Sequence, residues 1–255
     1  MGNEGCLLNS LLSRGFAGQT IQFSSDGVTF GVDGFLQYNF FGQKVWLTTT
    51  HIAMLVVILA LVVFALIANR VIKKANPEKA PGPFLNVIEY MVEAIDNLTK
   101  TNMGEKHGGK FSNYIGTIFC FILVANVAGL FGLRPPTADY GVTFGLALIT
   151  FVLIHYNGFK YQKMKHITNL FKPVLLTPIN IIGELATPLS MSLRLFGNVL
   201  SGTVMMGLIY GLIGKFAIIW PSVLHGYFDV FSGAIQTYVF AMLTMVFISN
   251  NFEEE

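Results

Sequence analysis

Apolar positions along the chain form long, unbroken runs. The runs lie at about 46–69, 111–132, 141–159, 174–214 and 222–248. A helix of about 20 residues crosses a hydrocarbon layer of about 30 Å, so each run is long enough to span a bilayer. A segment in lipid must satisfy its own backbone hydrogen bonds, and because these runs do not alternate, they favour helices over barrel strands. The pattern therefore predicts an all-α polytopic membrane protein with five membrane crossings.

The segment 84–103 has a different pattern. Charged residues separate its apolar positions, which recur at helical spacing: Phe84, Val87, Ile88, Met91, Val92, Ile95 and Leu98. This periodicity is typical of an amphipathic helix that lies on the membrane surface or against a partner, and does not span.

The first 45 residues are mixed in polarity and rich in glycine. The stretch "IQFSSDGVTFGVDGF" alternates weakly and predicts a short hairpin or an ordered tail. No basic region followed by an apolar one is present, so a cleavable signal peptide is not expected. We interpret 1–45 as an extracytoplasmic N-terminal segment and 46–255 as the membrane domain.

The run at 174–214 is too long for a simple crossing. About 40 residues make a helix of about 60 Å, twice the thickness of the membrane core. Such a helix must be strongly tilted, bent or partly broken. Together with the last run, it predicts a long, tilted helical hairpin over 174–249.

Charge and composition support this topology. Basic residues gather after the first run (Arg70, Lys73 and Lys74) and in the loop 160–172, which places these loops and the C-terminus in the cytoplasm and the N-terminus outside. Only 12% of residues are charged, about half the soluble average. The two cysteines, Cys6 and Cys120, suggest no disulfide framework, and no cofactor or metal motif is present. Neither a cofactor nor a nucleic-acid partner is expected.

A polar stripe runs through "PLSMSLRLFGNVLSG" at 188–202, with Arg194 near its middle. Spacings of three and four residues put five side chains on one helical face: Thr187, Ser190, Arg194, Asn198 and Ser201. Thr203 lies near the edge of this stripe, and Glu184 lies about 15 Å away toward the inner end of the run. An arginine within a membrane span is functional by default.

The last run carries Asp229, Ser232 and Gln236 on one face. A hairpin turn centred near residue 217 would bring Asn198 opposite about residue 237, so Gln236 is expected within a turn of Arg194 and Asn198. Asp229 should then lie about 18 Å from Arg194 in depth, which disfavours an ion pair between them. The partner of Arg194 is therefore expected on another subunit, an anion or a substrate. Gln236 could act with Arg194 or simply join two helices.

The stretch at 188–202 resembles the most characteristic motif of subunit a of F-type ATP synthases, and 125–151 and 228–249 resemble further parts of that family. The resemblance implies a non-catalytic stator subunit in a bacterial plasma membrane, beside a rotating ring of c subunits. Arg194 matches the essential arginine of the family and Gln236 the glutamine of its last helix. The carboxylate that each c subunit carries at mid-membrane would be the missing partner. A b-subunit stalk is also implied, with 84–103 as its candidate site.

The chain departs from the family at two positions. Many relatives have a glutamate nine residues after the arginine and a histidine seven before the glutamine, where this chain has Thr203 and Asp229. The implied function is ion transfer through two offset half-channels, an outer one near Asp229 and an inner one near Glu184 and Ser190. Both H⁺ and Na⁺ remain open as the ion. The alternative is a stand-alone channel or secondary transporter that binds an anion at Arg194.

Overall fold

The computed structural model describes residues 24–25, 28–29, 34–40, 43–75, 82–131, 133–163, 177–213 and 223–252. The expected features around Cys6, the basic loop at 164–172 and the hairpin turn near 217 lie outside these residues. Two antiparallel hairpins come first, with strands β1 (Ser24–Ser25) and β2 (Val28–Thr29), then β3 (Gly34–Phe40) and β4 (Gln43–Thr48). The membrane-embedded part is helical.

The predicted hairpin within 21–35 corresponds to β1 and β2, but the longer β3–β4 hairpin extends to the first helix. That helix, α2, spans Thr49–Lys74, so the predicted start of the first span at residue 46 is wrong by three residues. The residues 46–48 pair with β3 as part of β4, because backbone pairing across the hairpin competes with helix formation in this apolar segment.

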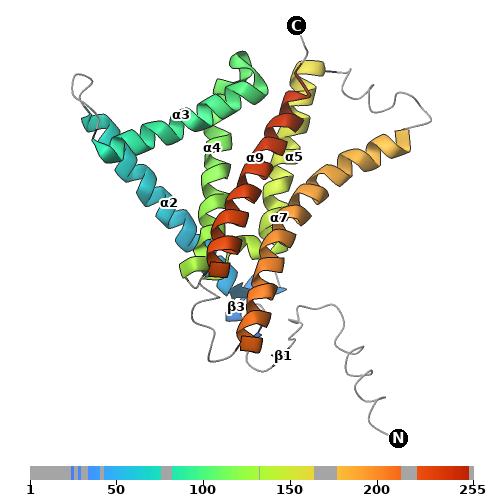
Figure 1. The fold of residues 1–255 in the computed structure, drawn as a ribbon. Helices are drawn as coiled ribbons and strands as arrows, with labels where there is room; N and C mark the ends of the chain where they lie inside the picture. The colour runs from blue at the N-terminus through green and yellow to red at the C-terminus, as the bar shows by residue number, and fades with distance from the viewer. Residues whose placement is uncertain are drawn as a thin grey trace, which may run out of the picture.

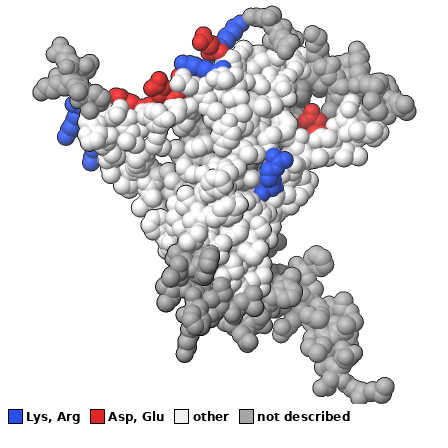
Figure 2. Space-filling view, viewed as in Figure 1, with Lys and Arg blue, Asp and Glu red and all other residues white. Residues whose placement is uncertain are grey.

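Five helical segments in the described part of the chain are long and apolar enough to cross a membrane: Thr49–Lys74, Glu105–Phe131, Tyr140–Gln162, Thr177–Ile209 and Val223–Ser249. They correspond in order to the five predicted spans. The amphipathic helix α3 (Pro83–Met103) is not among them. It lies across one end of the bundle, near the C-terminus (Figure 1), where charged side chains also gather (Figure 2).

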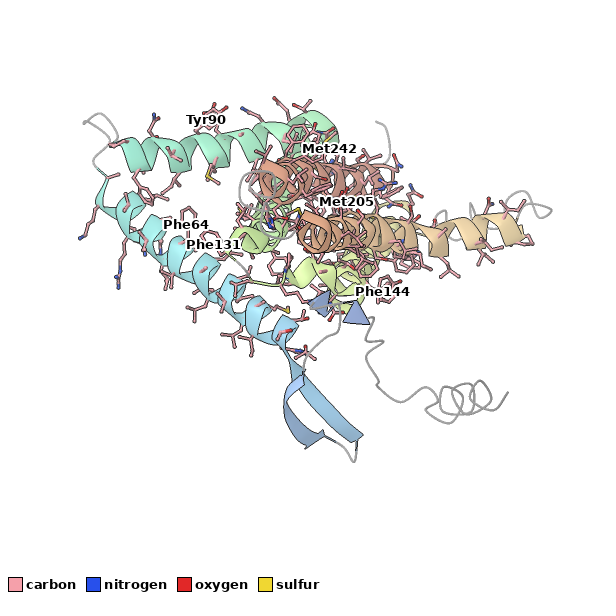
Figure 3. The ribbon with its side chains drawn as sticks, turned by 60° about the horizontal axis from the view of Figure 1, so that its bottom comes forward. Phe64, Tyr90, Phe131, Phe144, Met205 and Met242 are labelled. Atoms are coloured by element: carbon pink, nitrogen blue, oxygen red, sulfur yellow. The ribbon has the colours of Figure 1, made fainter. Side chains whose placement is uncertain are left out.

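The core of the bundle is built around α4 (Glu105–Val127) and α9 (Gly233–Ser249), which pack against each other. One cluster joins these helices to α3 and α5 (Tyr140–Gln162), and another joins them to α5 and α7 (Thr177–Ile213). Helix α2 packs on the end of α4 through Val57 and Ala125 and meets the start of α3, where the rings of Phe64 and Phe84 are 6.5 Å apart (Figure 3). The two helices α2 and α7 thus form the flanks of the molecule.

A close crossing positions α3 against α4. Gly104 joins the two helices with a φ of 77°, a conformation that glycine adopts without strain. One turn later, a Cβ at Gly108 would lie 2.7 Å from the Cα of Lys100, so only glycine fits. Lys100 also pairs with Asp96 on the surface of α3, and this hydrogen bond lowers the pKa of the Asp96 carboxyl.

Helix α7 explains the overlong apolar run. Its 37 residues form one continuous helix of about 56 Å, with Pro188 inside it. Proline removes one backbone hydrogen bond and clashes with the preceding turn, which bends a helix. Figure 1 shows α7 entering obliquely from the side and curving into the bundle direction. Of the three options for the overlong run, the structure therefore shows a bent and oblique helix that stays unbroken.

Candidate functional site

Arg194 lies in the middle of α7 on a face turned away from the bundle. Its side chain is exposed, as are those of Ser190 and Ser201, whereas its neighbour Leu195 is fully buried in the core. Exposed leucines flank the arginine, among them Leu193, which is 49% exposed. Of the predicted polar stripe, Ser190, Arg194 and Ser201 are therefore exposed on α7, whereas Thr187 and Asn198 are partly buried.

No described residue forms a hydrogen bond or ion pair with Arg194. The carboxylate of Asp229 is paired with His225. A guanidinium on the apolar surface of a membrane helix is costly without a counter-charge. Among the described residues, Arg194 is therefore a cation on the surface of a membrane helix without a counter-charge.

The alignment of the hairpin differs from the expected one. Asn198 was expected opposite residue 237. Instead, it accepts a hydrogen bond at 2.9 Å from Ser232, which lies five residues earlier in the chain. Likewise, a Cβ at Gly202 would lie 3.5 Å from the Cβ of Phe228. These contacts pair residue 198 with 232 and residue 202 with 228, so a step of four residues along α7 corresponds to a step of four along the opposing helix. By the same alignment, Arg194 lies level with Gln236. The expected depth of 18 Å between Asp229 and Arg194 is wrong and becomes about 10 Å, because the hairpin is centred earlier than position 217.

Gln236 is 8% exposed in α9, and its side-chain amide nitrogen has no hydrogen-bond partner among the described residues. An amide nitrogen buried without a partner costs about 1–3 kcal/mol, so this group is poised for a partner beyond the described chain, such as water. The structure places Gln236 at the level of Arg194, as expected, but no hydrogen bond joins them. The two residues therefore come from opposing helices at one depth without direct contact.

Asp229 lies in a short π-helix, η5 (Gly226–Ser232), that leads directly into α9. A π-helix carries more residues per turn than an α-helix and is often found at functional sites. The carboxylate of Asp229 faces Gly129, where an added Cβ would lie 3.1 Å from it. Glycine at 129 thus lets the backbone of the short 3-10 helix η1 (Ala128–Phe131), which follows α4, approach the acid closely.

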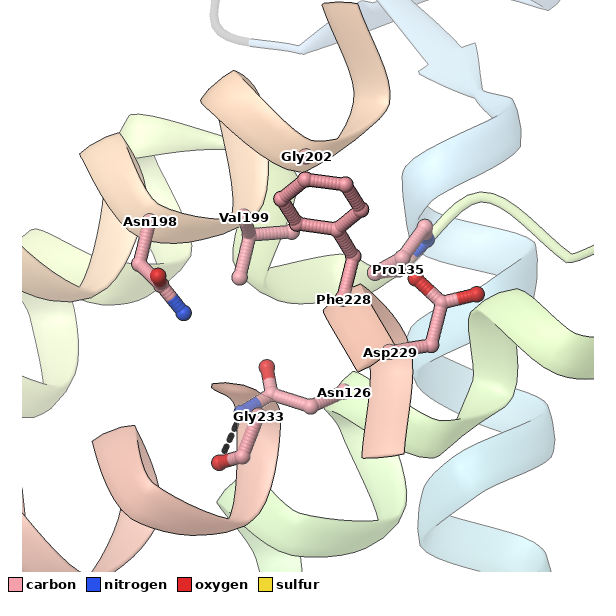
Figure 4. A pocket seen from close by; sticks show the side chains of 8 residues that line it. All are labelled: Asn126, Pro135, Asn198, Val199, Gly202, Phe228, Asp229 and Gly233. Carbon is pink, nitrogen blue, oxygen red and sulfur yellow. Dashed lines mark hydrogen bonds between the residues drawn. The ribbon is translucent and has the colours of Figure 1, made fainter. Parts of the chain in front are cut away.

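A small pocket lies beside Asp229 and between the two arms of the hairpin (Figure 4). Its volume of about 10 Å³ is the room for one water molecule. The amides of Asn126 and Asn198 face the same space, and the lining consists of Asn126, Pro135, Asn198, Val199, Gly202, Phe228, Asp229 and Gly233. The structure thus brings two of the predicted site residues, Asp229 and Asn198, to one polar pocket.

Asn126 is a site residue that the pattern of spacing did not reveal. It is 3% exposed and joins three elements: it accepts from Thr137 at 2.7 Å and donates to the carbonyl of Gly233 at 3.2 Å and the hydroxyl of Thr237 at 3.4 Å. The only sequence signal was an asparagine within an otherwise apolar span. Polar residues inside spans commonly join helices, so its place at the pocket depended on the fold.

The inner part of the site is looser. Glu184 is partly exposed near the start of α7, and Nε2 of His155 on α5 lies 3.8 Å from its carboxylate. Ser190 lies between Glu184 and Arg194 on the same helix but is exposed. On the other side of Arg194, the hydroxyls of Ser201 and Thr203 bond to carbonyls of their own helix. The structure does not bring Glu184, Ser190 or Thr203 into the pocket around Asp229.

Comparison with known proteins decides the family. The model of the family described as ATP synthase A chain matches residues 51–249. The chain belongs to this family. It is 33% identical over 242 residues to ATP synthase subunit a of Staphylococcus saprophyticus, covering 87% of this chain and 98% of that protein. It is 35% identical over 220 residues to the subunit a of Priestia megaterium, covering 80% and 92%.

A further relative differs in its ion. The chain is 39% identical over 160 residues to the sodium-ion-specific ATP synthase subunit a of Propionigenium modestum, covering 56% of this chain and 54% of that protein. The family therefore contains a member named for Na⁺. Membership of the ATP synthase subunit a family does not by itself decide which ion this chain transfers.

The pocket of this subunit a family member depends on Gly233. A Cβ there would lie 2.9 Å from the Cβ of Asn126, both of which are buried in α9 and α4. We expect Gly233→Ala to push Asn126 away, break its bond to the carbonyl of residue 233 and destabilise the chain by about 1–3 kcal/mol. Thermal stability of the purified protein in detergent measures this. Gly145→Ala, on α5 with open space around it, is the matched control, and equal stability of the two variants would contradict the packing.

Proposed function

We propose that this chain is the stator subunit a of an Fo motor, which loads and unloads ions on the carboxylates of a c-subunit ring through two offset half-channels. The observation that carries the proposal is the environment of Arg194. It is an exposed cation at the middle of a membrane helix, among exposed leucines, with no partner in the described chain. A mobile carboxylate that passes in trans would supply its counter-charge.

The shape of α7 supports the same partner. The helix is bent, oblique and exposed along the face that carries Ser190, Arg194 and Ser201. A surface of this kind suits a partner that slides along it, since apolar side chains seal the interface on either side of one charge. We place the c ring against the hairpin 174–249.

Ion transfer follows from the placement of the polar groups. In the outer half-channel, the pocket at Asp229 loads an ion onto a c carboxylate, which is then neutral and can face lipid. In the inner half-channel, Glu184 and Ser190 receive the ion after nearly a full turn of the ring. Arg194 favours the ionised carboxylate and so promotes release, and it blocks a direct path between the half-channels. Each unit charge that crosses 100 mV supplies about 2.3 kcal/mol.

The remaining assignments belong to the same proposal. The N-terminal residues 1–45 lie outside and the C-terminus in the cytoplasm of a bacterial plasma membrane, in agreement with the basic residues at the ends of α2 and α5. The helix α3, at the cytoplasmic end, is the candidate contact for a b-subunit stalk. The transferred ion is H⁺, with Na⁺ as the alternative, and no cofactor is required.

Transport by the isolated chain tests the proposal against a stand-alone channel or transporter that binds an anion at Arg194. We expect the purified chain in liposomes to move neither H⁺, Na⁺ nor chloride, because half of its pathway lies on the ring. The same chain purified with its c ring and b stalk should transport ions when ATP is supplied. Flux assays with ion-sensitive dyes measure both. Anion transport by the isolated chain that depends on Arg194 would contradict the motor.

A further inference from the structure

The inner arm of α7, residues 177–187, meets the bundle at a contact between a histidine and a carboxylate. The apolar side chains of this arm are largely exposed, and Figure 1 shows the arm turned away from the other helices. Glu184 lies in the arm, and its Oε2 is 3.8 Å from Nε2 of His155 on α5. The side chain of His155 is 28% exposed and that of Glu184 is 36% exposed. The contact therefore joins α5 to the exposed part of α7.

This contact lies between Arg194 and the inner end of the bundle. The helices α5 and α7 are antiparallel, since their outer parts meet at the rings of Tyr140 and Phe196, which are 5.7 Å apart. Glu184 precedes Arg194 by ten residues, which is about 15 Å along α7. His155 precedes the last residue of α5 by seven, which is about 10 Å. A proton that leaves the level of the arginine toward the inner side therefore passes the depth of this contact.

The surroundings of His155 determine its tautomer. Its Nδ1 is 3.2 Å from the carbonyl oxygen of Phe151, one helical turn earlier, and the rings of these two residues are 4.1 Å apart. A carbonyl oxygen only accepts hydrogen bonds, so Nδ1 carries a proton. In the neutral imidazole, Nε2 then presents a lone pair to the carboxylate of Glu184, which also has only lone pairs. The contact is therefore favourable when the pair holds one more proton.

We infer that His155 is a positioning residue of the inner half-channel: its doubly protonated imidazole holds Glu184 against α5 as an ionised carboxylate that can accept a proton from the ring. This inference rests on the proposed function and deepens it, because it assigns a group that controls the inner acid. An imidazolium beside a carboxylate favours the ionised form of the acid, whereas apolar surroundings favour the neutral form. A carboxyl that is already protonated cannot accept a proton from the ring.

The proton balance of this step involves the carboxyl groups alone. The neutral carboxyl of a c subunit gives its proton, through water, to the carboxylate of Glu184 and becomes ionised. Glu184 then gives the proton to water at the inner end and is ionised again beside the imidazolium. His155 keeps the protons on Nδ1 and Nε2 throughout, so it stands beside the path of the proton and not in it. The ring has lost one proton and the inner water has gained one.

The other charges near the pair stay constant in the range in which histidine titrates. The helices α7 and α9 and the short 3-10 helix η2 (Pro136–Ala138) pack on α5. Among the described residues of these three elements, Glu184 and Arg194 are the charged ones, and α5 itself adds Lys160 five residues after His155. Arginine and lysine keep their charge well above neutral pH, and the tyrosines of these helices titrate near pH 10. A change in inner pH near neutrality therefore acts on His155 and Glu184.

The test uses the complete ATP synthase in liposomes, with the catalytic subunits on the bath side, where the inner half-channel opens. The readout is the initial rate of ATP synthesis at fixed membrane potential and fixed internal pH, while the bath pH is raised from about 6 to about 8.5. Each rate is normalised to assembled complex and divided by the rate of the unsubstituted complex at the same bath pH. This ratio removes the pH dependence of the catalytic subunits.

Two variants at residue 155 separate charge from packing. His155→Gln keeps a polar side chain without a charge, and His155→Arg is charged at every bath pH. We expect His155→Gln to have about a tenth of the unsubstituted rate at a bath pH of about 6. Its ratio should rise toward one as the bath becomes alkaline, because the imidazole of the unsubstituted chain then loses its charge. His155→Arg should keep a ratio near one in the acidic bath and exceed one in the alkaline bath.

A second histidine, His107 on α4, is the matched control. It stands at the same end of the bundle, where its ring is 5.2 Å from the ring of Tyr161 and 4.1 Å from that of Phe252. These aromatic contacts place it beside the end of α5 and not beside Glu184. We therefore expect His107→Gln to give a ratio that does not change with bath pH.

The inference predicts a loss that depends on pH and is restored by a fixed charge. A loss in His155→Gln that is equal at every bath pH and is not restored in His155→Arg would overturn it, because His155 would then only hold α7 against α5. A ratio near one for His155→Gln over the whole range would overturn it as well. Failure of the proposed motor is a separate result: ATP synthesis would then survive in Arg194→Ala, whichever residue stands at position 155.

Discussion

Replacement of Arg194 by alanine is expected to abolish ATP-linked ion transport, by at least about a hundredfold. The arginine is the one charge on the exposed face of α7 between Glu184 and the turn of the hairpin, and its apolar neighbours cannot replace it. In the proposed motor, a c carboxylate would then have no fixed cation to favour its ionised form. The measurement is ATP-driven pumping by the reconstituted complex, followed with a pH-sensitive dye.

A second effect of the same variant separates electrostatics from misfolding. Arg194 is exposed, so alanine leaves no cavity in the core and the complex should assemble. Passive ion leak through the complex should rise, because the barrier between the two half-channels is gone. Leu193→Ala is the matched control, since it removes an exposed side chain next to Arg194 and keeps the charge. Intact coupled transport in Arg194→Ala would show that another residue carries this role.

Replacement of Asp229 by asparagine is expected to slow ion uptake from the outer side by about tenfold or more, whereas Thr203→Ala should change it by less than about twofold. The carboxylate of Asp229 lines the pocket and bonds to His225, while the hydroxyl of Thr203 is exposed and bonds to the carbonyl of Val199 in its own helix. An amide cannot bind and release a proton at neutral pH. The uptake rate under an imposed membrane potential measures both variants.

This comparison also tests why the chain departs from its relatives at these two positions. The observed hairpin alignment places residues 203 and 229 at nearly the same depth on opposing helices, as Gly202 and Phe228 show by their contact. In the proposed motor, an acid on either helix would therefore serve the same outer half-channel. Equal losses in Asp229→Asn and Thr203→Ala would argue against Asp229 as the acid of this half-channel.

The predicted elements agree closely with the structure because their signals are local. Runs of about 20 apolar residues are incompatible with water, so five spans and the amphipathic α3 could be predicted to within a few residues. The starts of two spans differ: α4 begins six residues before the predicted residue 111, and residues 46–48, before α2, belong to β4. Strand pairing depends on a partner strand elsewhere in the chain, so the hydropathy of residues 46–48 alone does not predict it.

The hairpin alignment illustrates a second limit. The spacing of residues along α7 correctly put Arg194, Ser190 and Ser201 on one face, because helical periodicity depends on sequence alone. The predicted difference in depth between Asp229 and Arg194 was wrong because it depended on where the turn of the hairpin lies. Apolar composition does not mark that turn. The length of the apolar run left α7 tilted, bent or partly broken, and only the structure showed a continuous helix with Pro188 inside it, packed against α5 and α9.

The sequence by itself determined that the chain spans a membrane and that Arg194 stands within a helix there. These follow from composition, periodicity and the cost of a charge in lipid, all of which act residue by residue. Only the tertiary structure decided that Arg194 faces outward, and that Asn126, Asn198 and Asp229 meet around one small pocket. Such contacts join α4, α7 and α9 across many intervening residues, and packing of whole helices sets them.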